Sequence, residues 1–298
     1  MASLECVPNV SDGRDARLLD RMAARLSDTP GVRLLDGHRD ADHHRSVFTL
    51  VGEAPALTSA ILGLCEEAVA AIDLRGHRGA HPRIGAVDVV PFVPVGRATM
   101  DEAVTAARTT GRAIAERFGI PVLLYEEAAT APHRRRLEAV RRGRFEGLAE
   151  KLRTPEWQPD FGPPAPHPTF GAVAVGARRI LVAYNVNLAT DRLEVATAVA
   201  AAVRASSGGL PHVKAMALAL PARRLVQVSM NLTDVEATPI AVVFDAVTRE
   251  AARHGVAVAD SEVVGLVPAA ALADVAARTL RISGWSPDKI LDTRLMPG

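Results

Sequence analysis

Two histidines and two arginines lie close together in a glycine-rich stretch, GHRGAHPRIGAVDVVPFVPV, at residues 76–95. Its glycines and its first proline break any helix, so His77 and His81 are not the i, i+4 pair that binds zinc on a helix. A histidine titrates near neutrality and passes a proton in either direction, and an arginine holds a carboxylate through paired hydrogen bonds. The stretch therefore indicates a loop for proton transfer on an anionic substrate. The alternative is that these residues only cap or pair at the surface.

Other motifs follow in order along the chain. They are LECVPNVSDGRD (4–15), DADHHRSVFTLVG (40–52), IPVLLYEEAA (120–129), RFEGLAEKL (144–152), DFGPPAPHPTFGAVAVGARRILVAYNVNL (160–188), VQVSMNLTDVEATP (226–239) and SEVVGLVPAAAL (261–272). Together with the loop, they resemble the glutamate formimidoyltransferase family, the folate-dependent enzymes of histidine breakdown. The resemblance covers nearly the whole chain. It implies a stand-alone, bacterial-type enzyme without the cyclodeaminase domain that some relatives carry.

Composition limits the class of protein. The 298 residues are 48% apolar, which is enough for the core of one large domain or two smaller ones. The formal net charge is +1 and aromatic residues make up 4%, so nothing indicates a nucleic-acid partner. We find no apolar run of membrane-spanning length and no secretory signal, and therefore expect no membrane partner. Cys6 and Cys65 are alone and far apart, which favours free thiols and a cytoplasmic protein.

The hydrophobic pattern predicts alternating strands and helices in both halves of the chain. In the first half we expect strands at 4–7, 32–35, 46–51, 86–95 and 122–125, and helices at 14–26, 55–72, 100–118 and 132–152. In the second half we expect strands at 180–187, 213–220, 225–231 and 263–267, and helices at 192–204, 239–254 and 268–280. Each half has the β-α-β-β-α-β order of a ferredoxin-like unit. The predicted fold is α+β, with two such subdomains at 1–180 and 181–298 and a ligand cleft between them.

A proline-rich segment lies near the junction of the two halves. Residues 155–171 contain six prolines and two glycines, which exclude regular structure and by themselves favour a linker. The resemblance implies instead that part of this segment binds folate. The residues concerned are Gly162, Pro163, Pro164, Ala165, Pro166, His167, Pro168, Thr169, Phe170 and Gly171.

The resemblance also implies the reaction. A formimidoyl group moves from N-formimidoyl-L-glutamate to N5 of tetrahydrofolate, the co-substrate, and no metal is expected. One group that accepts and returns a proton near neutral pH suffices for this chemistry. The resemblance assigns that role to His81, in the tetrapeptide AHPR, and His77 is the rival.

Both substrates carry carboxylates, so the site needs fixed cations. We choose Arg83 and Arg45, with Arg178 as a third candidate, and each has the alternative of a surface ion pair. The donor amidinium is itself cationic, and Asp40 would favour its binding. Asp40 belongs to a stretch, DGHRDADHH at 36–44, that could also be a solvated loop or a metal site.

Polar side chains recur on one predicted strand of the second half. Asn185 and Asn187 are two residues apart and therefore point to the same face. Such groups either line a ligand site or bond to a neighbouring loop, and Asn231 on a later strand has the same two interpretations.

The chain departs from the family pattern at two positions. His44 stands where the family typically has asparagine, and Ala241 where it commonly has histidine. We therefore include His44 among the substrate-binding candidates. Other hypotheses are a folate-dependent formyl or formimidoyl transferase with a different amine donor or acceptor, a non-catalytic folate-binding homologue, and a metalloenzyme. The family suggests a homodimer.

Overall fold

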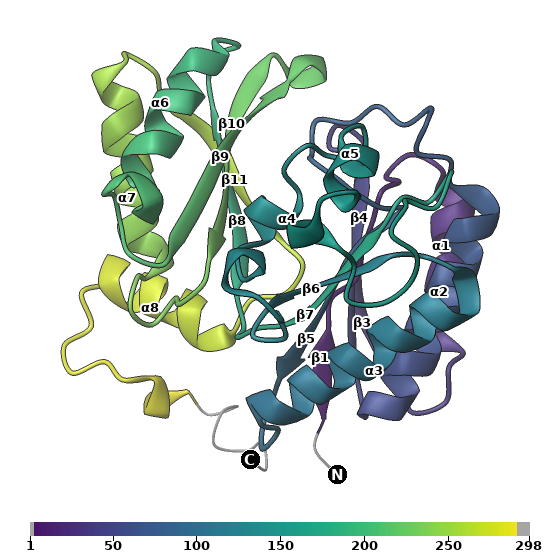
Figure 1. Ribbon diagram of the computed structural model, residues 1–298. Helices are drawn as coiled ribbons and strands as arrows, with labels where there is room; N and C mark the ends of the chain where they lie inside the picture. Colours follow the sequence, from purple (N-terminus) through teal and green to yellow (C-terminus); the bar gives the residue numbers. More distant parts are fainter. Residues whose placement is uncertain (1–2, 291–298) are drawn as a thin grey trace. The chain divides into compact units, whose positions relative to one another are not determined.

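The computed structural model describes residues 3–290 (Figure 1). The described residues form two compact units, divided between Arg179 and Ile180. Each unit has its own sheet and its own hydrophobic core. We call them the first and the second unit.

The first unit is built on a seven-stranded sheet. Its strands are β1 (Leu4–Cys6), β2 (Asn9–Val10), β3 (Val32–Asp40), β4 (Arg45–Gly52), β5 (Val87–Pro94), β6 (Val122–Glu126) and β7 (Val173–Ala177). The short strands β1 and β2 both pair antiparallel with β4 on one side and β5 on the other, and β3 pairs with β4. This core is the expected ferredoxin-like arrangement. Beyond it, β7 and then β6 extend the sheet parallel to β5.

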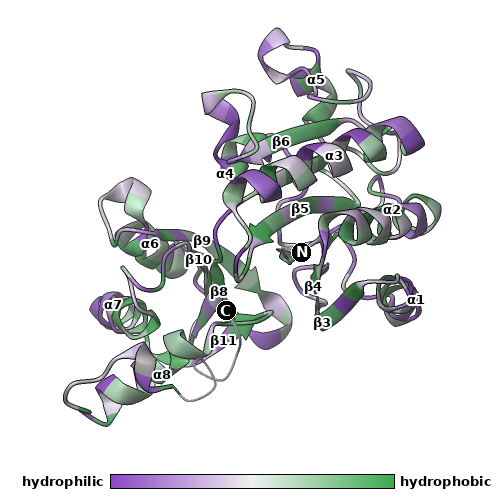
Figure 2. Ribbon diagram, turned by 90° about the horizontal axis from the view of Figure 1, so that it is seen from below, coloured by the Kyte–Doolittle hydropathy of each residue, from purple (hydrophilic) through white to green (hydrophobic). Residues whose placement is uncertain are grey.

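Helices cover both faces of this sheet. The helices are α1 (Ala16–Ser27), α2 (Ala54–Ala71), α3 (Met100–Phe118), α4 (Leu137–Val140) and α5 (Leu148–Leu152). The main core joins α1, α2 and α3 to side chains such as Phe48 and Phe92 on one face. A smaller core joins α4 and α5 to the other face, through Val89 and Leu123. Figure 2 shows the hydrophobic residues concentrated in strands such as β5 and β6.

The second unit is built on a smaller, four-stranded sheet. Its elements are β8 (Val182–Leu188), α6 (Leu193–Val203), β9 (Val213–Leu220), β10 (Leu225–Leu232), α7 (Ile240–Arg253), β11 (Val258–Val264) and α8 (Ala269–Thr279). The sheet order is β11-β8-β10-β9 with every pair antiparallel, as the ferredoxin-like expectation requires. One face packs on the helices around Val186, Val199 and Val243.

Several expectations from the sequence were wrong. The strand expected at 32–35 runs on to Asp40 as β3, through part of the stretch that could have been a solvated loop. The helix expected at 132–152 is broken into a 3₁₀ turn, α4 and α5, because Gly143 and Arg144 have φ of +90° and +55°. The strand β7 was missed because it directly follows the proline-rich segment. The strand expected at 263–267 begins earlier, at Val258, because exposed polar residues and a register shift hide its pattern.

The helix α2 bears on the expectation that no run of the chain reaches membrane-spanning length. By length and composition it is apolar enough to cross a membrane, and the sequence pattern had not singled it out. In the first unit, however, Leu57, Ile61 and Leu64 of this helix are fully buried in the main core. These contacts are those of a core helix in a folded domain.

The loop before β5 lies very close to the chain before β7. A Cβ atom added at Gly85 would lie 1.8 Å from the carbonyl oxygen of Ala172, which is a backbone atom. We expect Gly85→Ala to lower the free energy of unfolding by at least about 2 kcal/mol, because the strand must shift. Gly37→Ala is the matched control, since its nearest contact would be an ordinary 3.5 Å to the Phe48 ring. Equal midpoints of urea unfolding for both variants would contradict the prediction.

Candidate active site

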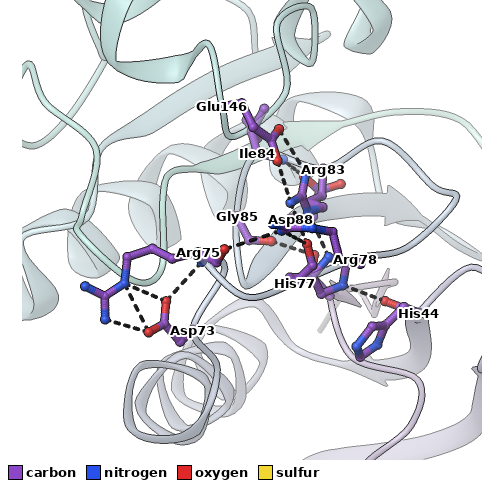
Figure 3. Close-up of polar contacts among 11 residues, drawn as sticks. His44, Asp73, Arg75, His77, Arg78, Arg83, Ile84, Gly85, Asp88 and Glu146 are labelled. Atoms are coloured by element: carbon purple, nitrogen blue, oxygen red, sulfur yellow. Dashed lines mark hydrogen bonds and ion pairs between the residues drawn. The ribbon is translucent and has the colours of Figure 1, made fainter.

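The histidine-containing loop after α2 packs against the turn between β3 and β4. The ring of His77 stacks on the ring of His44, with centroids 4.3 Å apart. The Nε2–H of His77 donates to the carbonyl oxygen of His44 at 3.1 Å, as Figure 3 shows. The turn and the loop, more than 30 residues apart in sequence, are therefore held together by two histidines.

Hydrogen bonds fix the protonation state of His77. Arg83 donates from Nε to the Nδ1 of His77 at 2.9 Å, so that nitrogen carries no proton. The other nitrogen, Nε2, is the donor to His44. Burial is the main cause that lowers the pKa of His77, although the bond to the His44 carbonyl opposes it. His77 is thus a neutral ring with both nitrogens engaged.

His44 is also held neutral. The backbone N–H of Gly13 donates to its Nδ1 at 3.1 Å. Burial, followed by the neighbouring His77, lowers the pKa of His44 to about 4, against the opposing charge of Asp12. Its backbone has φ of +52°, in the left-handed region, which asparagine adopts more readily than histidine.

Arg83 is the centre of this cluster and is only 6% exposed. Its guanidinium pairs with both oxygens of Glu146, at 2.8 and 3.2 Å, and also donates to the carbonyl oxygen of His77. The side chain of Glu146 is 59% exposed and, mainly through its hydrogen bond from Arg83, has a lowered pKa. A carboxylate on a ligand could replace Glu146 on the same guanidinium.

A second cluster surrounds His81. Arg45 donates to the Oδ1 of Asn9, and its buried Nε has no hydrogen-bond partner in the described chain. Burial, together with the nearby Arg141, lowers the pKa of Arg45 to about 10. This guanidinium, with its Nε buried and a hydrogen bond to a neutral amide, is suited to an anionic partner.

Arg141 is balanced by a carboxylate. Both its Nε and a terminal nitrogen donate to Oδ2 of Asp88, and the other oxygen of Asp88 accepts the N–H of Ile84 at 2.7 Å. The carboxylate is nearly fully buried. It therefore joins α4 and the start of β5 to the loop that carries His81.

His81 lies beside these cations. Burial, then the charges of Arg45 and Arg141, hold its pKa well below the ordinary range, and His43 acts in the same direction. The rings of His43 and His81 have centroids 6.2 Å apart. Asp40 accepts the backbone N–H of His43 at 2.7 Å and faces its ring at 3.3 Å. These causes favour the neutral form of the His81 ring.

A pocket of about 540 Å³ opens beside the Arg83 cluster, entirely within the first unit. Its lining is rich in cationic and imidazole side chains, from Arg75, Arg78, Arg83, Arg144, His77 and His167, with Glu146 as the carboxylate. Its volume is in the range of small-molecule sites. The lining includes Gly79 but not His81.

The proline-rich segment divides into two parts. Pro166, His167 and Pro168 line the pocket. Phe170 is fully buried, and Gly171, with φ of +84°, lies so close to the Ile84 carbonyl that a Cβ atom would be 2.2 Å from it. The end of the segment is therefore scaffold, whereas its middle faces the pocket.

Other candidates lie elsewhere. Arg178 donates to the carbonyl oxygen of Arg179, and its charge acts on Glu5. Asn185 donates to Glu262 and Asn187 to Asp260, both on β11, and Asn231 is exposed. Within residues 3–290, no group of three or more histidine, cysteine or acidic side chains is arranged to hold a metal ion. Both cysteines are free and buried, as expected.

Sequence reasoning missed four residues of these clusters: Asn9, Asp88, Arg141 and Glu146. Asp88 had a usable signal, because a carboxylate inside the apolar run AVDVVPFV must find a cationic partner if the strand is buried. Arg141 and Glu146 had none, since they lie in a stretch full of charges. Their partners are 53 and 63 residues away along the chain.

The fold and the site define an α+β protein of two ferredoxin-like units with a pocket suited to anionic small molecules. Residues 3–178 match the family model for the formiminotransferase domain, N-terminal subdomain, and residues 183–283 match that for the formiminotransferase domain. The chain therefore belongs to the formiminotransferase family, as the sequence motifs predicted.

Individual relatives support the same family assignment. A glutamate formimidoyltransferase of Streptococcus pyogenes serotype M1 is 44% identical over 98% of both chains. One from Thermoplasma acidophilum is 43% identical over 99% of this chain and 98% of that protein. The formimidoyltransferase-cyclodeaminase of Rattus norvegicus is 41% identical over 92% of this chain but only 52% of its own length.

The geometry of His44 predicts an acid-sensitive fold. Its folded-state pKa of about 4 lies below the ordinary 6.5, so the unfolded chain takes up the proton first as the pH falls. The resulting stabilisation is complete above pH 6.5 and is lost towards pH 4. We expect His44→Asn, which suits the left-handed backbone, to lose less stability than wild type between about pH 7 and pH 5. Urea unfolding at both pH values measures this, and equal losses in the two proteins would contradict it.

Proposed function

We propose that this chain transfers a formimidoyl group from N-formimidoyl-L-glutamate to N5 of tetrahydrofolate, which is the co-substrate. The observation that carries the proposal is 44% identity over 98% of both chains to the streptococcal glutamate formimidoyltransferase. The cationic pocket and the neutral ring of His81 supply groups that this reaction needs.

The reaction requires one proton to be moved. N5 of tetrahydrofolate forms a bond to the formimidoyl carbon and gives up its proton, and a tetrahedral intermediate results. The bond from that carbon to the glutamate nitrogen then breaks as this nitrogen takes up a proton. A single base that returns the same proton satisfies both steps.

We assign that role to His81 rather than to His77. Both nitrogens of His77 are engaged, by Arg83 and by the His44 carbonyl, so a proton transfer there would break the loop's own hydrogen bonds. The lowered pKa of His81 keeps it in the accepting form at neutral pH, because burial and two arginines oppose its charge. The same cations make its conjugate acid a strong proton donor for the leaving nitrogen.

Arg45 and Arg83 are the proposed carboxylate-binding residues. Arg45 has a buried Nε without a hydrogen-bond partner in the described chain, and Arg83 pairs with an exposed carboxylate that a ligand could displace. Asp40, which acts on Arg45, is the proposed partner of the amidinium. His44 lies in the turn on the donor side, where it acts as a neutral ring.

The pocket is the proposed folate site. Its lining includes Pro166, His167 and Pro168 of the segment Gly162–Gly171, together with arginines that suit the carboxylates of the folate tail. His167 accepts the backbone N–H of Phe170 at its Nδ1, which leaves Nε2 as the donor.

The same proposal includes the remaining expectations: an N-terminal subdomain at 1–180, a C-terminal one at 181–298, a homodimer and a cytoplasmic location. Two free, buried cysteines are consistent with a reducing compartment.

The direct test is an assay with tetrahydrofolate and formimidoylglutamate, followed by acid conversion to the methenyl product and its absorbance. We expect His81→Ala to lower turnover about a hundredfold or more, because the proton carrier is lost. The acid limb of kcat/KM in the wild type should lie well below pH 6.5 and be absent from the residual activity of this variant.

His77→Ala separates the two assignments. It should lower activity through the loss of the Arg83 contact but keep the acid limb of the wild type. A His81→Ala variant with normal turnover and an inactive His77→Ala variant would reverse the assignment. A wild-type protein without transfer activity would refute the proposed function.

Folinate, a stable reduced folate, tests the pocket. We expect it to raise the melting temperature of the wild type increasingly with concentration. Arg78→Gln should weaken folinate binding about threefold to tenfold, because it removes an exposed cation from the lining. Arg97→Gln, an exposed arginine outside the lining, is the control. Equal affinity in all three proteins would place folinate elsewhere.

A further inference from the structure

A nearly buried ion pair contacts the loop that carries His81. It joins Asp88 of β5 to Arg141, the residue directly after α4, and these side chains are 4% and 12% exposed. Taking two charges out of water is costly, so a buried ion pair is weak evidence of added stability. Its contacts with the surrounding segments indicate what else the pair does.

Asp88 uses its two oxygens on different segments. Oδ1 accepts the backbone N–H of Ile84 at 2.7 Å, three residues after His81. Oδ2 accepts Nε of Arg141 at 2.9 Å and a terminal nitrogen of the same guanidinium. One carboxylate therefore fixes the end of the loop and the guanidinium together.

The backbone around Arg141 is fixed as well. Nζ of Lys151, on α5, donates to the carbonyl oxygens of Ala139 and Val140, both at 2.6 Å. It also donates to that of Arg142 at 3.2 Å. The last carbonyls of a helix have no partner within it, and here one ammonium supplies the donors. Arg141 is thus held through its backbone neighbours and through its guanidinium, which keeps its charge in one place.

Charged and titratable groups act on His81 from several segments. Burial is the largest cause that lowers the pKa of His81, and three groups act in the same direction: Arg45 on β4, Arg141 after α4 and His43 in the turn between β3 and β4. Asp88 on β5 and Asp40 on β3 are the carboxylates whose charges act on Arg45. Asp88 is therefore a counter-charge common to both arginines.

We propose that the Asp88–Arg141 pair positions the proton transfer that the proposed function, on which this role rests, assigns to His81. Asp88 fixes the end of the loop at Ile84, and Arg141 is held where its charge acts on the ring. The imidazolium that forms when His81 accepts the N5 proton is then disfavoured by a fixed cation, which promotes return of the proton to the leaving nitrogen. Both residues of the pair act through His81.

Arg141→Gln tests the role of the charge, and Arg141→Lys is the conservative variant that keeps it. In Arg141→Gln we expect the acid limb of kcat/KM to move up by about one pH unit, because a cation that opposes protonation of His81 is lost. Arg141→Lys should restore the limb of the wild type. Arg142→Gln is the matched control, since it removes the same charge from the exposed side chain of the next residue. A merely structural role would lower kcat in Arg141→Gln and leave the limb in place.

The ionisation of His81 can also be followed without turnover. NMR titration of protein with isotope-labelled histidine rings gives its midpoint, and the signal is identified by its absence from His81→Ala. The midpoint should rise by about one pH unit in Arg141→Gln and stay unchanged in Arg142→Gln. Equal midpoints in the wild type and Arg141→Gln would overturn the inference. A midpoint that moves while the acid limb stays would overturn it too, because His81 would then not carry the proton.

A double variant avoids the cost of a buried carboxylate without a partner. Asp88→Asn combined with Arg141→Met removes both charges and keeps an oxygen for the Ile84 N–H. If Arg141→Gln does not fold, a smaller rise of the His81 midpoint in the double variant supports the inference, and an unchanged midpoint overturns it.

The wild type separates this inference from the proposed function. A wild type that transfers the group, with the same acid limb and midpoint as Arg141→Gln, overturns the inference alone. A wild type without transfer activity refutes the proposed function, and the positioning role falls with it.

Discussion

The buried guanidinium of Arg83 is the group on which the shape of the active-site loop depends. A charge with 6% exposure must be paired and hydrogen-bonded to remain in the fold. Its partners are His77 in the same loop and Glu146 from the segment before α5. His77 in turn binds the turn that carries His44. Three segments distant in sequence are therefore ordered around one side chain.

This arrangement gives neighbouring histidines different surroundings. His44 and His77 each accept an N–H donor at Nδ1, and their rings stack, so both are kept neutral by groups of the scaffold. Burial, and then the charges of Arg45 and Arg141, lower the pKa of His81 and favour its neutral form. The effect of the charges weakens when an anionic ligand arrives, whereas a hydrogen-bonded ring must first break its bonds. The loop thus contains two rings that hold its shape and a third that the proposed function assigns to proton transfer.

Local patterns determined which parts of the fold were predictable. Long apolar or amphipathic runs such as α2, α3 and β9 can be recognised from their own residues alone. The stretch from 132 to 152 consists largely of helix formers, yet Gly143 turns the chain there. Lys151 then donates to the carbonyls of Ala139 and Val140 that end α4. Such a contact depends on the folded chain and has no counterpart in the spacing of residues.

The residues of the candidate site also differ in how far the sequence could predict them. His77, His81 and Arg83 are close in sequence, so the sequence could predict a shared candidate site in this loop. Asp88 and Arg141 could not be paired from spacing, because the contact joins β5 to the end of α4 across 53 residues.

The two units use one topology for different electrostatics. In the first, the face turned away from α1, α2 and α3 carries arginines and is partly covered by α4 and α5. In the second, the face turned away from the helices has a row of amides that donate to Asp260 and Glu262. A ferredoxin-like sheet needs only one apolar face for its core, so the other face is free to vary in charge.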